Sequence, residues 1–349
     1  GVVMDRKELK QCDFLSYIPS ALPYLLIQPK NVVIIGARNS IDLWQPSYFG
    51  ASRVSIAEHD ASVVKALESQ RESLGPMQIP VFFGSGRNLL WNLPQDLGLI
   101  LLSKTGFFPT GNFGLQEDYD LTVEAISTYM KQLQGNGILF IQMFLSPPPR
   151  IELRLARNIK AALKKTGTQE PEKSLLIYRS WDTVNFLVKK DGFSEADFSK
   201  VSQFLKSRQF DLLYPDVVGH EKFITGLDYL HLFHRILTDK LYSEFYSSYT
   251  FDIRETTDDR PFFHYFLRLS KTIDIYELSG RKWAYFLHEG MFHPFILIVL
   301  LFIAICIFGA AFMLSRNVRS KPETRNPRLI TGSLVYFTLI GFAFMFVEV

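Results

Sequence analysis

Residues 31–36 read NVVIIG and residues 53–58 read RVSIAE. Each is a short apolar, largely β-branched run, and the first ends at a glycine that permits a sharp turn. Similar runs recur at residues 79–84, 98–103 and 137–143. Helical patterns separate several of the runs, at residues 61–73 and 117–134. Strands that alternate with helices predict a parallel sheet covered by helices on both faces.

Two more strand-like runs extend this pattern. A helix is predicted at residues 149–165, and runs at 174–179 and 183–189 follow it. Ser180, Trp181 and Asp182 between the runs fit a chain reversal, so the two runs predict an antiparallel hairpin at the sheet edge. Five parallel strands with a terminal antiparallel hairpin resemble the fold of S-adenosylmethionine-binding transferases. We therefore expect an α/β, Rossmann-like transferase sheet.

Composition narrows the class of protein. The 349 residues exceed one average domain, and 47% hydrophobic with 21% charged residues exclude a disordered chain. A net charge of +3 gives no reason to expect a nucleic acid partner. Two cysteines exclude a zinc site with several cysteine ligands, and His231 and His234 lack a third ligand at a recognisable spacing. We therefore predict no metal site.

The C-terminal residues read as membrane segments. Residues 295–314 are twenty residues without a charge, enough for a helix to cover a hydrocarbon core of ~30 Å. A second apolar run, 329–349, is expected to be truncated at the chain end, with Glu348 either functional or near an interface. We predict a multi-pass protein in a lipid bilayer, cut from a longer chain with further transmembrane helices.

The side of the membrane stays open. The connection 315–328 carries five basic residues against Glu323, which favours a cytoplasmic connection and would place residues 1–290 outside. Nucleotide-like cofactors are cytosolic, so we favour a cytoplasmic soluble domain on chemical grounds.

The candidate ligand site follows from the sheet. Ligands bind at the carboxyl ends of parallel strands, which brings together residues 36–42, 58–60, 84–87 and 103–106. Glu58 lies twenty-two residues after Gly36, where a carboxylate can accept hydrogen bonds from both ribose hydroxyls. The alternative is that Glu58 is a solvated strand end.

Several stretches resemble the membrane-embedded branch of the spermidine synthase (polyamine aminopropyltransferase) superfamily. They are LPYLLIQPKNVVIIGA at 22–37, GASRVSIAEHD at 50–60, GSGRNLL at 84–90, EDYDLTVEAISTYMKQLQGNGIL at 117–139, FDIRETTDDRPFFHYFLR at 251–268 and IGFAFMFVEV at 340–349. The resemblance implies a transferase domain at 1–190, a mainly helical extension at 191–290 and two transmembrane helices at 291–349. It implies S-adenosylmethionine or its decarboxylated form as cofactor, bound by Gly36, Ala37, Asp42, Glu58, Gly84, Ser85 and Gly86.

The chain also departs from the family pattern. Arg38 and Asn39 stand where the family has small loop residues, and Ser85 stands where it has the aspartate that holds the adenine amino group. The fourth strand ends without a carboxylate, which leaves Ser103 and Lys104 as weak catalytic candidates. Lys104 would repel a polyamine if it faces the site, and would favour a small or anionic acceptor.

Two functions therefore stay open. One is a membrane-anchored, spermidine synthase-like or methyltransferase-like enzyme whose small-molecule acceptor is unknown. The other is a catalytically degenerate domain that senses a ligand or acts as a scaffold on a transporter-like membrane bundle.

The segment around residues 256–266 carries two further predictions. Thr256, Thr257 or Asp258 is expected to cap a short helix, or Asp258, Asp259 and Arg260 are expected to form an Asp–Arg pair. The alternative is a loop that covers the cofactor mouth and couples it to the membrane. The aromatic residues that follow predict a membrane-interface belt. They are Phe262, Phe263, Tyr265, Phe266, Trp283, Tyr285 and Phe286.

Overall fold

A computed structural model describes most of the chain. The described residues are 11–37, 40–69, 79–104, 115–216, 222–224, 226, 228–287, 292–317 and 341. The chain forms two compact units, Gly1–Phe292 and His293–Val349. Each unit is described by itself.

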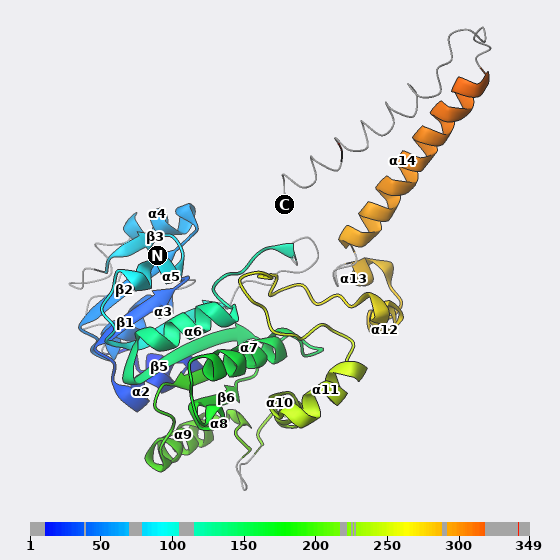
Figure 1. The fold of residues 1–349 in the computed structure, drawn as a ribbon. Helices are drawn as coiled ribbons and strands as arrows, with labels where there is room; N and C mark the ends of the chain where they lie inside the picture. Colours follow the sequence, from blue (N-terminus) through cyan, green and yellow to red (C-terminus); the bar gives the residue numbers. More distant parts are fainter. Residues whose placement is uncertain are drawn as a thin grey trace. The chain divides into compact units, whose positions relative to one another are not determined.

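One mixed sheet organises the first unit (Figure 1). Its strands are β1 (Asn31–Ile35), β2 (Arg53–Glu58), β3 (Val81–Phe83), β4 (Leu97–Lys104), β5 (Leu133–Phe144), β6 (Leu175–Arg179), β7 (Thr183–Lys189) and β8 (Asp211–Tyr214). Their order is β3-β2-β1-β4-β5-β7-β6-β8. Strands β3, β2, β1, β4 and β5 pair in parallel, and β7, β6 and β8 pair antiparallel. The five parallel strands and the antiparallel hairpin of β6 and β7 are confirmed, but the hairpin does not form the sheet edge, because β8 pairs with β6.

Strand β8 was not expected, because it lies in the predicted helical extension. It has only four residues, and antiparallel pairing with β6 fixes it at the edge. The Asp211 carboxylate accepts hydrogen bonds from the Arg179 guanidinium at 3.1 and 3.2 Å and from the Phe223 N–H at 2.7 Å. These buried hydrogen bonds join segments that are far apart in sequence, so no local sequence pattern predicts the strand.

Helices cover both faces of the sheet. The described α-helices of this unit are α2 (Leu22–Ile27), α3 (Ser40–Tyr48), α4 (Ala61–Ser69), α5 (Gly86–Trp91), α6 (Val123–Gln132), α7 (Ile151–Lys165), α8 (Pro171–Ser174), α9 (Glu195–Arg208), α10 (Tyr229–Leu237), α11 (Asp239–Ser248), α12 (Thr272–Leu278) and α13 (Trp283–Phe286). Helix α6 is shorter than the predicted helix at 117–134. The Thr122 hydroxyl caps its start by accepting from the Ala125 N–H, and Leu133 already belongs to β5.

Alternate residues of the central strands build two cores. Val33 and Ile35 of β1 pack with α5, α6, α7 and α10, whereas Val32 and Ile34 pack with α2, α3, α4 and α9. Figure 1 shows α6 and α7 side by side over one face. Burial on both faces explains why these strands are apolar throughout.

The membrane predictions have a mixed outcome. The helix expected at 295–314 is confirmed as α14 (Phe292–Asn317), and its large apolar side chains are exposed. A crossing is not confirmed, since the described residues include no helix that is long and apolar enough to span a bilayer. The second predicted span and Glu348 lie outside the described residues, apart from Gly341.

Candidate functional site

Glu58 is the last residue of β2 and lies at the carboxyl edge of the parallel strands. Its side chain is fully buried, so the alternative of a solvated strand end is wrong. Oxygen Oε1 accepts hydrogen bonds from the backbone N–H groups of His59 at 2.9 Å and Asp60 at 3.0 Å. These bonds fix the carboxylate against the turn that leads from β2 to α4.

The second carboxylate oxygen of Glu58, Oε2, differs from Oε1 in its hydrogen bonding. Oε2 is buried, and no hydrogen-bond partner for it exists among the residues that the structure describes. Such an unsatisfied buried acceptor costs about 1–3 kcal/mol, more for a charged group. The carboxylate therefore has unused capacity to accept hydrogen bonds, and two neighbouring hydroxyls of a ligand would fit this capacity.

Two glycines shape the chain around Glu58. Gly36 follows β1 with a φ of 71°, and its N–H donates to the Ala57 carbonyl at 2.9 Å. Gly84 follows β3 with a φ of 140°, and its N–H donates to the Glu58 carbonyl at 2.9 Å. Both φ values favour glycine. A Cβ at Gly84 would meet no atom within 4 Å, so the backbone there borders open space.

The segment after Gly36 is partly described. Ala37 is buried, and residues 38–39 lie outside the described part. Helix α3 continues through Pro46 to Tyr48, although a proline removes one N–H donor from the helix. Asp42 is buried in the first turn of α3, and burial together with the Asp42 charge raises the pKa of the Tyr24 hydroxyl.

Ser85 and Gly86 have structural explanations. The Ser85 hydroxyl caps α5 by accepting from the Asn88 N–H at 3.3 Å. A Cβ at Gly86 would lie 2.5 Å from Cδ1 of Ile35, so glycine is required for α5 to pack on β1. Packing against Ile35 thus accounts for a glycine at this position, and the expectation that Gly86 admits a ligand to the backbone stays a prediction.

The weak catalytic candidates lie at the end of β4. Ser103 is buried and pairs in register with Gln142 of β5. Lys104 is the last residue of β4, and its side chain lies outside the described part. The effect of Lys104 on acceptor choice therefore stays a prediction.

A polar cluster that the sequence argument missed connects β4 to α6. Asp118 Oδ2 lies 3.3 Å from Nε2 of His264, and the Tyr129 hydroxyl donates to Asp120 Oδ1 at 3.4 Å. Burial, together with the nearby Asp120 and Asp118 charges, raises the pKa of Tyr129 well above its usual value. The connection thus places two carboxylates at the edge where β4 itself supplies none. The signal was present in the letters EDYD after the apolar strand.

The segment 256–260 joins this cluster. The Asp258 carboxylate forms an ion pair with Arg87 of α5 at 2.6 Å and accepts from the Thr122 hydroxyl at 2.7 Å. Asp258 therefore pairs with Arg87 of α5 and not with Arg260, as the prediction had it. Arg260 donates instead to the Glu255 carbonyl at 2.8 Å. The pair ties this segment to the helix that follows Gly84 and Ser85.

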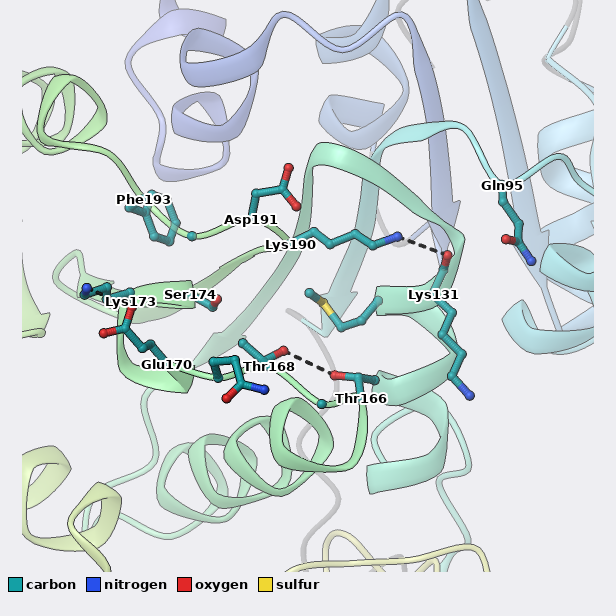
Figure 2. Close-up of a pocket in the computed structure, with 14 residues that line it drawn as sticks. Gln95, Lys131, Thr166, Thr168, Glu170, Lys173, Ser174, Lys190, Asp191 and Phe193 are labelled. Carbon is teal, nitrogen blue, oxygen red and sulfur yellow. Dashed lines mark hydrogen bonds and ion pairs between the residues drawn. The ribbon is translucent and has the colours of Figure 1, made fainter.

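A separate cavity of about 630 Å³ lies at the opposite edge of the sheet. Its walls come from α8, the end of α6 and the segments that follow α7 and β7, near the start of the parallel strands. Figure 2 shows Lys190 of this cavity, whose ammonium group donates to the Lys131 carbonyl at 3.3 Å. Ligands of such sheets bind at the carboxyl ends, so this cavity is not the predicted cofactor site.

Comparisons with known proteins give fold likeness only. No family model and no curated protein matches the chain. A spermidine synthase from Thermotoga maritima is 17% identical with a TM-score of 0.36, and the match covers 56% of this chain and 65% of that one. A spermidine synthase in complex with the transition state analogue AdoDATO is 16% identical with a TM-score of 0.38, and the match covers 64% of this chain and 75% of that one. Human methyltransferase-like protein 13 in complex with SAH is 13% identical with a TM-score of 0.37, and the match covers 59% of this chain and 92% of that one. The structural neighbours of this chain thus include spermidine synthases and methyltransferases, and a membrane-embedded branch is not among those named here.

Proposed function

We propose that the chain is a spermidine synthase-like transferase that binds S-adenosylmethionine or its decarboxylated form. The observation that carries the proposal is the buried Glu58 carboxylate. One oxygen is fixed by two backbone N–H groups, and the other lacks a donor within the described ranges. Two ribose hydroxyls would supply the missing donors through charge-assisted hydrogen bonds.

The neighbouring residues would shape the rest of the cofactor site. Gly36 and Gly84 turn the chain at the ends of β1 and β3, and the open space beside Gly84 leaves room for a ligand. Ala37 and Asp42 would continue this wall from the β1 side. The cofactor, when bound, supplies an electrophilic carbon next to a sulfonium.

Proton transfer from the acceptor needs a base near the end of β4. Asp118 and Asp120 are better candidates than Ser103 and Lys104, because a carboxylate accepts a proton from an attacking amine directly. We infer that one of these two carboxylates has this role. The acceptor itself is a small molecule of unknown identity.

A ligand sensor or scaffold is the second candidate. It is favoured by Ser85, whose hydroxyl caps α5 where the family has an adenine-binding aspartate. Calorimetric titration with both cofactors separates the two functions. Absence of binding to either cofactor would reject the enzyme proposal. Binding without turnover on putrescine or other acceptors would favour the sensor.

We further propose association with a lipid bilayer, with the Gly1–Phe292 unit on the cytoplasmic side. The support is α14, whose exposed side chains include Leu297 (64%), Phe302 (66%) and Phe308 (66%). Flotation with vesicles tests association, and alkaline carbonate extraction then distinguishes surface binding from insertion. A chain that stays in the aqueous fraction would refute the proposal.

A further inference from the structure

Large apolar side chains are exposed on the short helices α12 and α13 and the residues that flank them. They are Leu269 (72%), Ile273 (75%), Leu278 (57%), Trp283 (61%) and Tyr285 (60%). We name these five residues the α12–α13 surface. These five large exposed apolar side chains lie within residues 269–285, and exposed apolar groups that gather in this way mark an interaction site.

The α12–α13 surface is built on a packed base. Ile275 is fully buried, and the ring of Tyr276 lies 5.3 Å from the ring of Trp283 and 5.3 Å from that of Phe286. The Arg268 guanidinium donates to the carbonyls of Tyr246 and Tyr249 at 2.6 Å each, which attaches the start of the segment to the end of α11. The exposed side chains therefore sit on a fixed support.

The aromatic residues of the predicted membrane-interface belt differ in burial. Phe263, Phe266 and Phe286 are buried, so they belong to the core and not to a belt. Trp283 and Tyr285 are exposed, as a membrane interface requires. The sequence alone could not separate these groups, since all of them are aromatic residues near an apolar helix.

The charged side chains around the α12–α13 surface include more basic than acidic groups. Lys271 pairs with Asp274 at 3.0 Å, and Arg281 pairs with Glu277 at 3.4 Å. Lys282 adds a third basic group, and its ammonium lies 5.7 Å from the centre of the Tyr285 ring. Basic groups beside Trp and Tyr suit the headgroup region of a bilayer with anionic lipids.

We propose that the α12–α13 surface lies in the boundary between headgroups and acyl chains of a lipid bilayer. The inference rests on the proposed lipid association. It commits to lipid because α14 begins at Phe292, five residues after Leu287, and exposes apolar side chains at consecutive positions 295–303. A helix apolar all round has no polar face for water, so it requires burial or lipid. The surface would then hold the Gly1–Phe292 unit at the membrane.

Trp283 reports on this directly. The chain has four tryptophans, Trp44, Trp91, Trp181 and Trp283. In two single-tryptophan chains, either Trp283 or Trp181 is retained and the others become Phe. Trp181 is the matched control, because it is 79% exposed at the turn between β6 and β7. Each full chain is mixed with phosphatidylcholine–phosphatidylserine vesicles that contain brominated acyl chains.

We expect brominated lipid to quench Trp283 fluorescence at least ~2-fold and to leave Trp181 unchanged. Ile273→Glu should weaken the quenching of Trp283, because it places a charge on the same surface. A chain that does not float with vesicles overturns the lipid association. A chain that floats while Trp283 is quenched no more than Trp181, or is quenched equally with Ile273→Glu, overturns the assignment of this surface alone.

Discussion

Glu58→Gln tests the candidate site with the smallest change of shape. Glutamine keeps a carbonyl oxygen that can accept from His59 N–H and Asp60 N–H, as Glu58 Oε1 does at 2.9 and 3.0 Å. At the position of Oε2 it places an NH₂ group, which cannot accept a hydrogen bond from a hydroxyl. The substitution therefore removes the acceptor that the structure leaves unsatisfied and retains the turn after β2.

The magnitude follows from the hydrogen bonds that would be lost. A hydrogen bond to a charged group contributes about 1.5–3 kcal/mol, and each ~1.4 kcal/mol changes affinity tenfold. Loss of one ribose hydrogen bond should weaken cofactor binding by at least ~10-fold, and loss of two by more. The free energy of unfolding should change little, because the backbone contacts of Oε1 persist.

Isothermal titration with both cofactors and chemical denaturation supply the two readouts. Glu68→Gln is the control, since it neutralises an exposed carboxylate near the end of α4. Parental affinity in Glu58→Gln would refute the ribose role. An equal loss of affinity in Glu68→Gln would also refute it, because the effect would then come from net charge.

Three further predictions concern residues around the site and the core. Gly86→Ala should lower the free energy of unfolding by about 1–3 kcal/mol, because the new Cβ would overlap Ile35. Adding Ile35→Val should restore part of this loss, because it removes Cδ1. Equal unfolding midpoints for Gly86→Ala and the parent would contradict the packing argument. Burial raises the pKa of Glu152 from 4.5 to about 7, so the folded state holds this proton more tightly. The free energy of unfolding should therefore fall as pH rises from about 4.5 to 7, by up to ~1.4 kcal/mol per unit, and denaturation of Glu152→Gln should lack this slope. A double-mutant cycle on Arg87→Ala and Asp258→Ala should give a coupling energy on the order of 1 kcal/mol, and additive unfolding energies would show that the ion pair does not attach the segment.

Local patterns were sufficient to find the five parallel strands and the antiparallel hairpin of β6 and β7. Strand β2 has the predicted bounds 53–58, and β7 has the predicted bounds 183–189. Burial on both faces favours apolar and β-branched residues on both sides of such strands, so short apolar runs in the sequence mark them. Strand β8 was not predicted, because its buried Asp211–Arg179 pair depends on contacts between residues far apart in sequence.

The candidate site was predictable in place but not in detail. The position of Glu58 at the end of β2 follows from the alternation of strands and helices, and the structure confirms that position. The cluster of Asp118, Asp120 and His264 depends on docking of residues 256–264 against α6, which no spacing in the sequence reveals. Tertiary contacts of this kind carry the information that local periodicity lacks.

The loop after β3 shows why a motif is weaker evidence than a contact. Gly84, Ser85 and Gly86 together read as a ligand loop, yet each has its own reason. Ser85 caps α5, Gly86 makes room for Ile35, and only Gly84 borders open space. A residue that folding fully explains gives no support to a ligand. Glu58 is the exception at this edge, because folding satisfies one of its oxygens and leaves the other buried without a partner in the described part of the chain. Within the described residues that oxygen makes no contribution to folding, and this is why the proposed ligand contact is placed on Glu58.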